Sequence, residues 1–104
     1  MMSWGGIDLV QEMMEEARTR PGARLCWSGI GSRESMGQAV VRSVFLGFDD
    51  EAARFHVRVA LSPAIVNGEV VIRAHRFVGT NSSLVQRQSE AWAALEGRPQ
   101  EQAS

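Results

Sequence analysis

The chain has 104 residues and a net charge of −1; 44% of its residues are hydrophobic and 22% are charged. These proportions are typical of a folded globular domain and argue against a disordered chain. They also argue against a general nucleic-acid binder, which carries a clear excess of positive charge. No apolar run reaches the roughly 18 residues that a membrane helix needs, so we expect no membrane span. A single cysteine, Cys26, excludes an intramolecular disulfide, and we expect a cytoplasmic protein.

An N-terminal helix is predicted over residues 7–18, because apolar residues recur there at the spacing of one helix face. That face consists of Ile7, Val10, Met13 or Met14, and Ala17. Pro21 and Gly22 end the helix. Residues 24–28 then form a short predicted strand, and the glycine- and serine-rich residues 29–37 form a predicted loop.

Residues 38–48 fit either a strand or a helix. We favour a strand because β-branched and aromatic residues dominate and the acidic turn Asp49–Ala53 follows. If Asp49 pairs with Arg54 across a short loop, apolar residues face one another in the two strands. The predicted pairs are Phe48 with Phe55, Leu46 with Val57, and Val44 with Val59.

Asn67-Gly68 is the strongest local signal, since it separates two alternating runs at residues 55–61 and 70–78. Both residues accept the positive φ of a type I′ turn, which joins adjacent antiparallel strands. The turn predicts that Val57 faces Val78, Arg58 faces Phe77 and Ala60 faces His75. Pro63 cannot donate to the ladder, so it bends the first strand or places it at a sheet edge.

A C-terminal helix is predicted over residues 83–95. Its apolar side consists of Leu84, Val85, Gln88, Ala91, Trp92 and Leu95. Gly97 and Pro99 end this helix. The sequence therefore predicts an α+β fold, a four-stranded antiparallel meander sheet flanked by an N-terminal and a C-terminal helix, in the order α-β-β-β-β-α. Residues 1–97 form a single predicted domain, and residues 98–104 form a polar tail.

Alternation along the strands predicts two different faces of the sheet. One is an apolar core face under at least one helix, with Arg42 and Arg76 as its charges. Its apolar members are Val40, Val44, Leu46, Phe48, Phe55, Val57, Val59, Leu61, Val70, Ile72, Ala74 and Val78. The other face is mixed: Phe45, Arg58 and Phe77 form one predicted row, and Ser43, Ala60 and His75 form the next. Either this face is open for binding, or the second helix or a partner subunit covers it.

The mixed face supplies the candidate binding residues, which are Phe45, His56, Arg58, Arg73, His75 and Phe77. An arginine beside two aromatic rings can stack on either one, and such a face also suits the bases of nucleic acids. We predict no catalytic residue, no metal ligand and no cofactor.

Other residues that could carry chemistry have plainer interpretations. Glu34 stands where a dinucleotide-binding loop has its third glycine, which favours an ordinary connection over an anion-binding loop at residues 29–37. Cys26 is interpreted as an inert cysteine, and His56 and His75 lie on different rows, which disfavours a shared metal site. Two acidic clusters, one at residues 12–16 and one at residues 49–51, are interpreted as solvated charge.

The functional expectation follows from the mixed face, where Val41, Phe45, Val71 and Phe77 would expose an apolar patch typical of interaction sites. We expect a small non-enzymatic protein that binds another protein, as an adaptor or inhibitor, and that forms a homodimer. The alternative is binding of nucleic acid or an anionic ligand through the same face. The small size and the exclusive use of arginine as the basic residue suit a bacterial or phage accessory protein.

Overall fold

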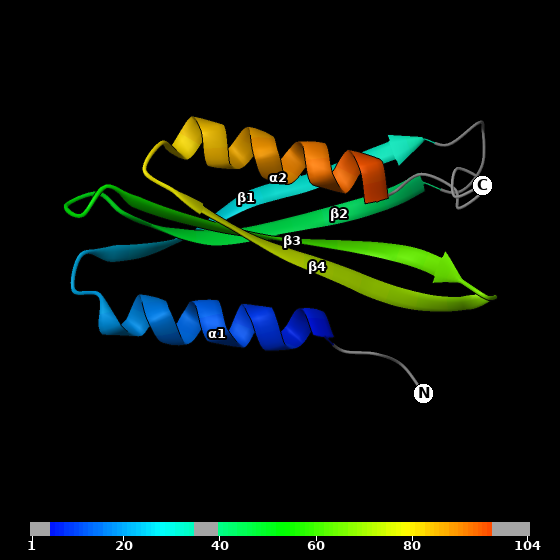
Figure 1. Ribbon diagram of the computed structural model, residues 1–104, viewed down its shortest axis with the longest axis horizontal. Coiled ribbons are helices and arrows are strands. Elements are labelled where there is room, and N and C mark those ends of the chain that lie inside the picture. Colours follow the sequence, from blue (N-terminus) through cyan, green and yellow to red (C-terminus); the bar gives the residue numbers. More distant parts are fainter. Residues whose placement is uncertain (1–4, 35–39, 97–104) are drawn as a thin grey trace.

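The computed structural model describes residues 5–34 and 40–96. Its elements are α1 (Gly5–Thr19), β1 (Ala23–Glu34), β2 (Val40–Asp50), β3 (Phe55–Val66), β4 (Glu69–Gly79) and α2 (Ser82–Glu96). The strands form one antiparallel four-stranded sheet in the order β1-β2-β3-β4. The two helices lie on opposite faces of this sheet, so the fold has three layers (Figure 1). The predicted α+β order is confirmed, whereas the polar tail predicted for residues 98–104 lies outside the described residues.

The turn at Asn67-Gly68 is confirmed. Asn67 has φ 53° and Gly68 has φ 79°, as a type I′ turn requires. The predicted pairs Val57 with Val78, Arg58 with Phe77 and Ala60 with His75 are all present. Turn chemistry therefore determined the register of β3 and β4.

The predicted pairing of β2 with β3 is wrong by two positions. Asp50 pairs with Phe55, so that Phe48 faces Val57, Leu46 faces Val59 and Val44 faces Leu61. A shift by two preserves the side on which each residue lies, because side chains alternate with a period of two. The assignment of these residues to the two faces is therefore correct, but the residues that lie side by side across β2 and β3 differ from the predicted ones. The strand interpretation of residues 40–48 is confirmed.

The first strand is longer than predicted. β1 extends to Glu34, so residues 29–34 of the predicted glycine-rich loop are paired with β2 instead. The register shifts between Trp27 and Gly29, which makes Ser28 the extra residue of a β-bulge. The loop prediction is therefore wrong for residues 29–34. The last three residues of that predicted loop lie outside the described residues.

The main apolar core lies between α1 and the sheet. Its buried members are Met13, Leu46, Phe48, Val57 and Val59, with seven partly buried apolar residues packed around them. Met13, rather than Met14, points into this core, since their exposed fractions are 2% and 40%. Val70 and Val78 were predicted as core residues, but on the edge strand β4 they are 58% and 49% exposed.

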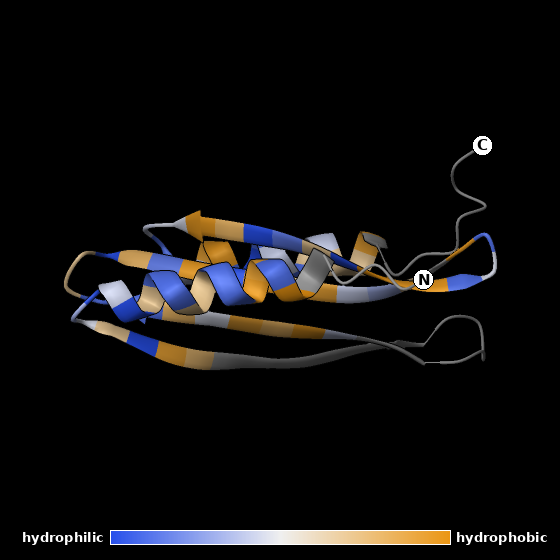
Figure 2. Ribbon diagram, turned by 90° about the horizontal axis from the view of Figure 1, so that it is seen from below, coloured by the Kyte–Doolittle hydropathy of each residue, from blue (hydrophilic) through white to orange (hydrophobic). Residues whose placement is uncertain are grey.

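Both helices pack mainly on β3 and β4. Figure 2, which views the molecule from the α1 side, shows strands extending beyond the helix on either side of it. No helix among the described residues is long and apolar enough to cross a membrane. The sheet is therefore covered unevenly, with β1 at the less covered margin.

Candidate functional site

The mixed face is covered by α2 and is not an open binding surface. Phe45, His56 and Arg58 are only 5%, 6% and 7% exposed. Phe45 packs with Ala60 of β3 and Ala93 of α2 in a second, smaller core. Of the two arrangements that the sequence left open for this face, the structure shows cover by the second helix.

The predicted row of Phe45, Arg58 and Phe77 is also corrected. Phe45 pairs with Ala60, whereas Arg58 lies between Gly47 and Phe77 because the β2–β3 register differs by two positions. Among the described side chains, the apolar patch expected on this face is largely covered: Phe45 is buried, and Val71 and Phe77 are half-buried. The side chain of Val41 lies outside the described ones.

The remaining candidates lie at the margin of α2. His75 is exposed and stacks on Trp92 of α2, with ring centroids 5.7 Å apart and an interplanar angle of 25°. Phe77 is half-buried and meets His75 edge-on at 4.6 Å. Arg73 is half-buried on the same strand. These rings fasten the edge of α2 to β4 and do not form an open stacking platform.

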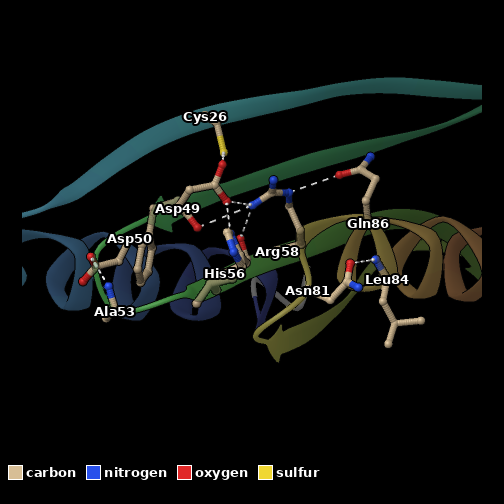
Figure 3. A network of polar contacts seen from close by, with 11 residues as sticks. Cys26, Asp49, Asp50, Ala53, His56, Arg58, Asn81, Leu84 and Gln86 are labelled. Carbon is tan, nitrogen blue, oxygen red and sulfur yellow. Dashed lines mark hydrogen bonds and ion pairs between the residues drawn. The ribbon is translucent and has the colours of Figure 1, made fainter.

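An ionic network joins the buried His56 and Arg58 to the half-buried Asp49 (Figure 3). Arg58 Nη1 donates to Asp49 Oδ1 at 3.0 Å, and His56 Nδ1 lies 2.9 Å from the same oxygen. An ionised carboxylate only accepts hydrogen bonds, so Nδ1 of His56 carries its proton here. Burial raises the pKa of Asp49, but the hydrogen bonds from His56 and Arg58 and the charge of Arg58 outweigh it, so the pKa lies below its ordinary value.

The guanidinium of Arg58 is held close to the sheet. Its Nη1 also donates to the carbonyls of Val57 at 2.8 Å and Phe48 at 3.4 Å. Gly47 makes room for it, since a β-carbon at Gly47 would lie 2.9 Å from Cδ of Arg58 and 2.0 Å from the Val57 carbonyl oxygen. On the other side, Nε of Arg58 donates to Gln86 Oε1 of α2 at 3.1 Å. Arg58 therefore links the sheet to the helix that covers it.

Cys26 borders this network as a neutral thiol. Its Sγ donates to Asp49 Oδ2 at 3.7 Å. Burial raises the pKa of Cys26, and the nearby Asp49 carboxylate adds to the rise while Arg58 opposes it. A thiol is a poor nucleophile compared with its thiolate, so this arrangement does not activate Cys26. Among residues 5–34 and 40–96, no group of three or more His, Cys, Asp and Glu side chains is arranged to bind a metal.

A second group of charged residues joins α1 to the sheet. Glu16 pairs with Arg76 of β4 and, at 3.4 Å, with Arg20. Arg20 also reaches Asp50 at 3.4 Å and lies 4.1 Å from the ring centroid of Phe55. Glu16 and Asp50 were interpreted as solvated charge, but they neutralise arginines at the edge of the main core.

Apolar side chains are exposed along the margin between α1 and β1. Glu16 reaches β4, and helix residues advance by about 100° each, so Ile7 and Met14 lie on the flank of α1 that points away from β4. They are 45% and 40% exposed, and Leu25 of β1 is 50% exposed on the same side of the sheet. These three residues define what we call the α1–β1 flank.

Asp49, Gln86 and Gly47 belong to the network but were not predicted as site residues. With the correct β2–β3 register, Asp49 faces His56 and Gly47 faces Arg58, so the pairing itself would have revealed both. Gln86 was missed because the predicted apolar side of α2 is only partly correct: Val85 and Trp92 do pack on the sheet, but Gln88 and Ala91 are exposed. Val85, Ser89 and Ala93 are the buried stripe, while Leu84 and Leu95 are 45% and 61% exposed.

Comparison with known proteins yields no relative. No protein-family model, no curated protein and no solved structure matches this chain.

Proposed function

We propose that this chain is a small non-enzymatic protein-binding domain, an adaptor or inhibitor, that binds through the α1–β1 flank rather than through the mixed face. The observation that supports the proposal is the exposure of Ile7 and Met14 of α1 and of Leu25 on the α1 side of the sheet, at 40% to 50%. Large apolar side chains gathered on a surface are typical of interaction sites.

The edge strand at this margin supports the same proposal. β1 pairs with β2 on one side, and no described strand pairs with its other side. An unpaired strand edge offers N–H and C=O groups to a further strand. The bulge at Ser28 bends β1 and so favours residues 23–27 for such pairing. A partner strand would then be bound both by main-chain hydrogen bonds to β1 and by contact with the side chain of Leu25.

A second copy of the chain is the partner that we propose first, because a two-fold contact uses one patch twice. Nucleic-acid or anion binding has less support. Phe45 is buried beneath α2, and the charge of Arg58 is paired with Asp49. The overall charge of −1 also disfavours a polyanionic partner.

Light scattering after gel filtration tests the proposal. We expect a mass of twice the monomer for the natural chain, and the monomer mass for Leu25→Glu with an unchanged circular dichroism spectrum. Leu95→Glu is the matched control, because Leu95 is a more exposed leucine, at 61%, on the opposite side of the sheet. A monomeric natural chain, or a dimer that Leu25→Glu leaves intact, would contradict the proposal.

A further inference from the structure

The contact between α2 and the sheet combines a stripe of small and polar side chains with one aromatic edge, where Trp92 meets His75 and Phe77. The buried stripe of α2 is Val85, Ser89 and Ala93, which are 2%, 0% and 5% exposed. The helix carries two leucines, and both remain close to half exposed or more. α2 therefore docks without its largest aliphatic side chains.

Hydroxyl groups at the centre of this contact are bonded within each layer rather than between layers. Ser43 and Ser62 are 7% and 0% exposed, and their hydroxyls bond across the strands at 3.4 Å. The hydroxyl of Ser89 donates to the Gln86 carbonyl of its own helix at 2.7 Å. Separating α2 from the sheet would leave these hydrogen bonds intact, although it would also open the apolar cluster of Phe45, Ala60 and Ala93.

The charge of Arg58, which lies beneath α2, is neutralised by a residue of the sheet and not by the helix. Arg58 bonds to the Asp49 carboxylate and to two carbonyls of the sheet, and only its Nε reaches across to Gln86. Breaking a buried ion pair is costly because it leaves an unpaired charge. The pair of Arg58 and Asp49 lies within the sheet, so undocking of α2 leaves this pair intact.

The N-terminus of α2 is also capped by its own segment of chain. The Asn81 side-chain oxygen accepts from the Leu84 N–H at 3.0 Å, and the Asn81 carbonyl accepts from the Val85 N–H at 3.0 Å. Gly79 precedes this cap, and a β-carbon there would lie 2.9 Å from Cγ2 of Val85. Residues 79–81 thus form a short link between β4 and α2, with glycine at the position that lies against Val85.

From these observations we propose that α2 is a detachable cover, which undocks while α1 and the sheet stay folded and which thereby exposes Phe45, Arg58 and Phe77. This inference does not depend on the proposed function, because it concerns the other side of the sheet. An isolated helix of 15 residues is marginal in water. Undocking therefore melts α2, and its amide hydrogens exchange with solvent.

Native-state hydrogen exchange on the full chain tests the inference. In the natural protein we expect the amides of residues 86–95 to exchange at least about tenfold faster than the best-protected amides of β3 and α1. Gln86→Ala should accelerate exchange in α2 by about fivefold, the effect of losing one hydrogen bond of ordinary strength. It should leave β3 and α1 unchanged at low denaturant. Gln88→Ala is the matched control, since Gln88 is an exposed glutamine of the same helix.

Two results would overturn the inference. One is equal protection of α2, β3 and α1 in the natural chain, which means that α2 opens only with global unfolding. The other is a Gln86→Ala variant in which all elements lose protection equally, or in which Gln88→Ala has the same effect as Gln86→Ala. The measurement on the natural chain decides the question even if a variant folds poorly.

Discussion

The sheet has one apolar side and one polar side, although both are covered by a helix of 15 residues. On the α1 side, Met13 of the helix packs against Leu46, Phe48, Val57 and Val59, and the charged residues lie at the edge. On the α2 side, buried serines lie beneath the helix, the ion pair of Arg58 and Asp49 lies near the turn between β2 and β3, and the apolar cluster is reduced to Phe45, Ala60 and Ala93 with two flanking rings. The length of the covering helix alone thus says little about how much each side contributes to stability, because buried apolar area provides most of the driving force for folding.

The largest expected effect on the polar side comes from its carboxylate. Asp49→Asn should lower the free energy of unfolding at pH 7 by about 2–4 kcal/mol, because Arg58 stays buried without its counter-charge. Chemical denaturation measures this difference. Glu51→Gln is the control, since Glu51 is an exposed acid on the adjacent turn. If both variants are equally stable, the ion pair does not hold the polar side together.

The same residue predicts a pH dependence. The pKa of Asp49 is lower in the folded chain than in the unfolded chain, so its stabilising effect is complete above the unfolded value of about 4. It is lost as the pH falls through the lowered folded-state pKa. The stability difference between the natural chain and Asp49→Asn should therefore shrink on acidification from neutral pH. A difference that is constant down to about pH 3 would contradict the assigned direction of the shift.

A smaller effect is expected where Arg58 lies against the backbone. Gly47→Ala should cost about 1–3 kcal/mol through overpacking, because the new carbon would lie 2.9 Å from Arg58 Cδ and 2.0 Å from a backbone oxygen. Urea denaturation measures the cost. Gly22→Ala is the control, since its new carbon would come no closer than 3.1 Å to Asp50 Oδ1. If Gly47→Ala is as well tolerated as Gly22→Ala, Arg58 is not confined by the close approach at Gly47.

The smallest expected effect separates the two sides of α2 itself. Val85→Ala should cost about 1.5 kcal/mol, from the loss of two buried methyl groups, whereas Leu84→Ala should change stability by less than about 0.5 kcal/mol. Val85 is 2% exposed and Leu84 is 45% exposed, although the two are neighbours in the sequence. Thermal unfolding of both variants compares them. A larger cost for Leu84→Ala would mean that the helix docks through a different stripe.

The α1 side was predicted well from the sequence because alternation and helical spacing directly report apolar burial. Leu46, Phe48, Val57 and Val59 were all assigned to the core face, and the Asn67-Gly68 turn gave the correct pairing of β3 with β4. The choice between Met13 and Met14 was open because both fit one turn of the same stripe.

The α2 side was predicted poorly because its buried residues do not look apolar. Val85 and Trp92 were placed correctly, but Ser89 and Ala93 complete the docked side while the more hydrophobic Leu84 and Leu95 face outward, so hydrophobic spacing identified only part of the buried side of the helix. The network was hidden by the loop between β2 and β3, where moving the pairing by two residues removes Asp49 from its position opposite His56. No feature of the turn Glu51–Arg54 comparable to Asn-Gly sets that register, although Arg54 adopts φ 50°.

Two phenylalanines of one strand provide the most direct test of the difference between the two sides. Phe45 and Phe48 are 5% and 0% exposed, and they lie on the α2 side and the α1 side of β2. Phe48→Ala should cost about 3–5 kcal/mol, as for a phenylalanine deleted from a well-packed core. Phe45→Ala should cost less than Phe48→Ala, because its cost is limited by the free energy with which α2 docks on the sheet. Equal losses in urea denaturation, or a larger loss for Phe45→Ala, would contradict the account of an apolar side that holds the fold and a polar side that is only covered.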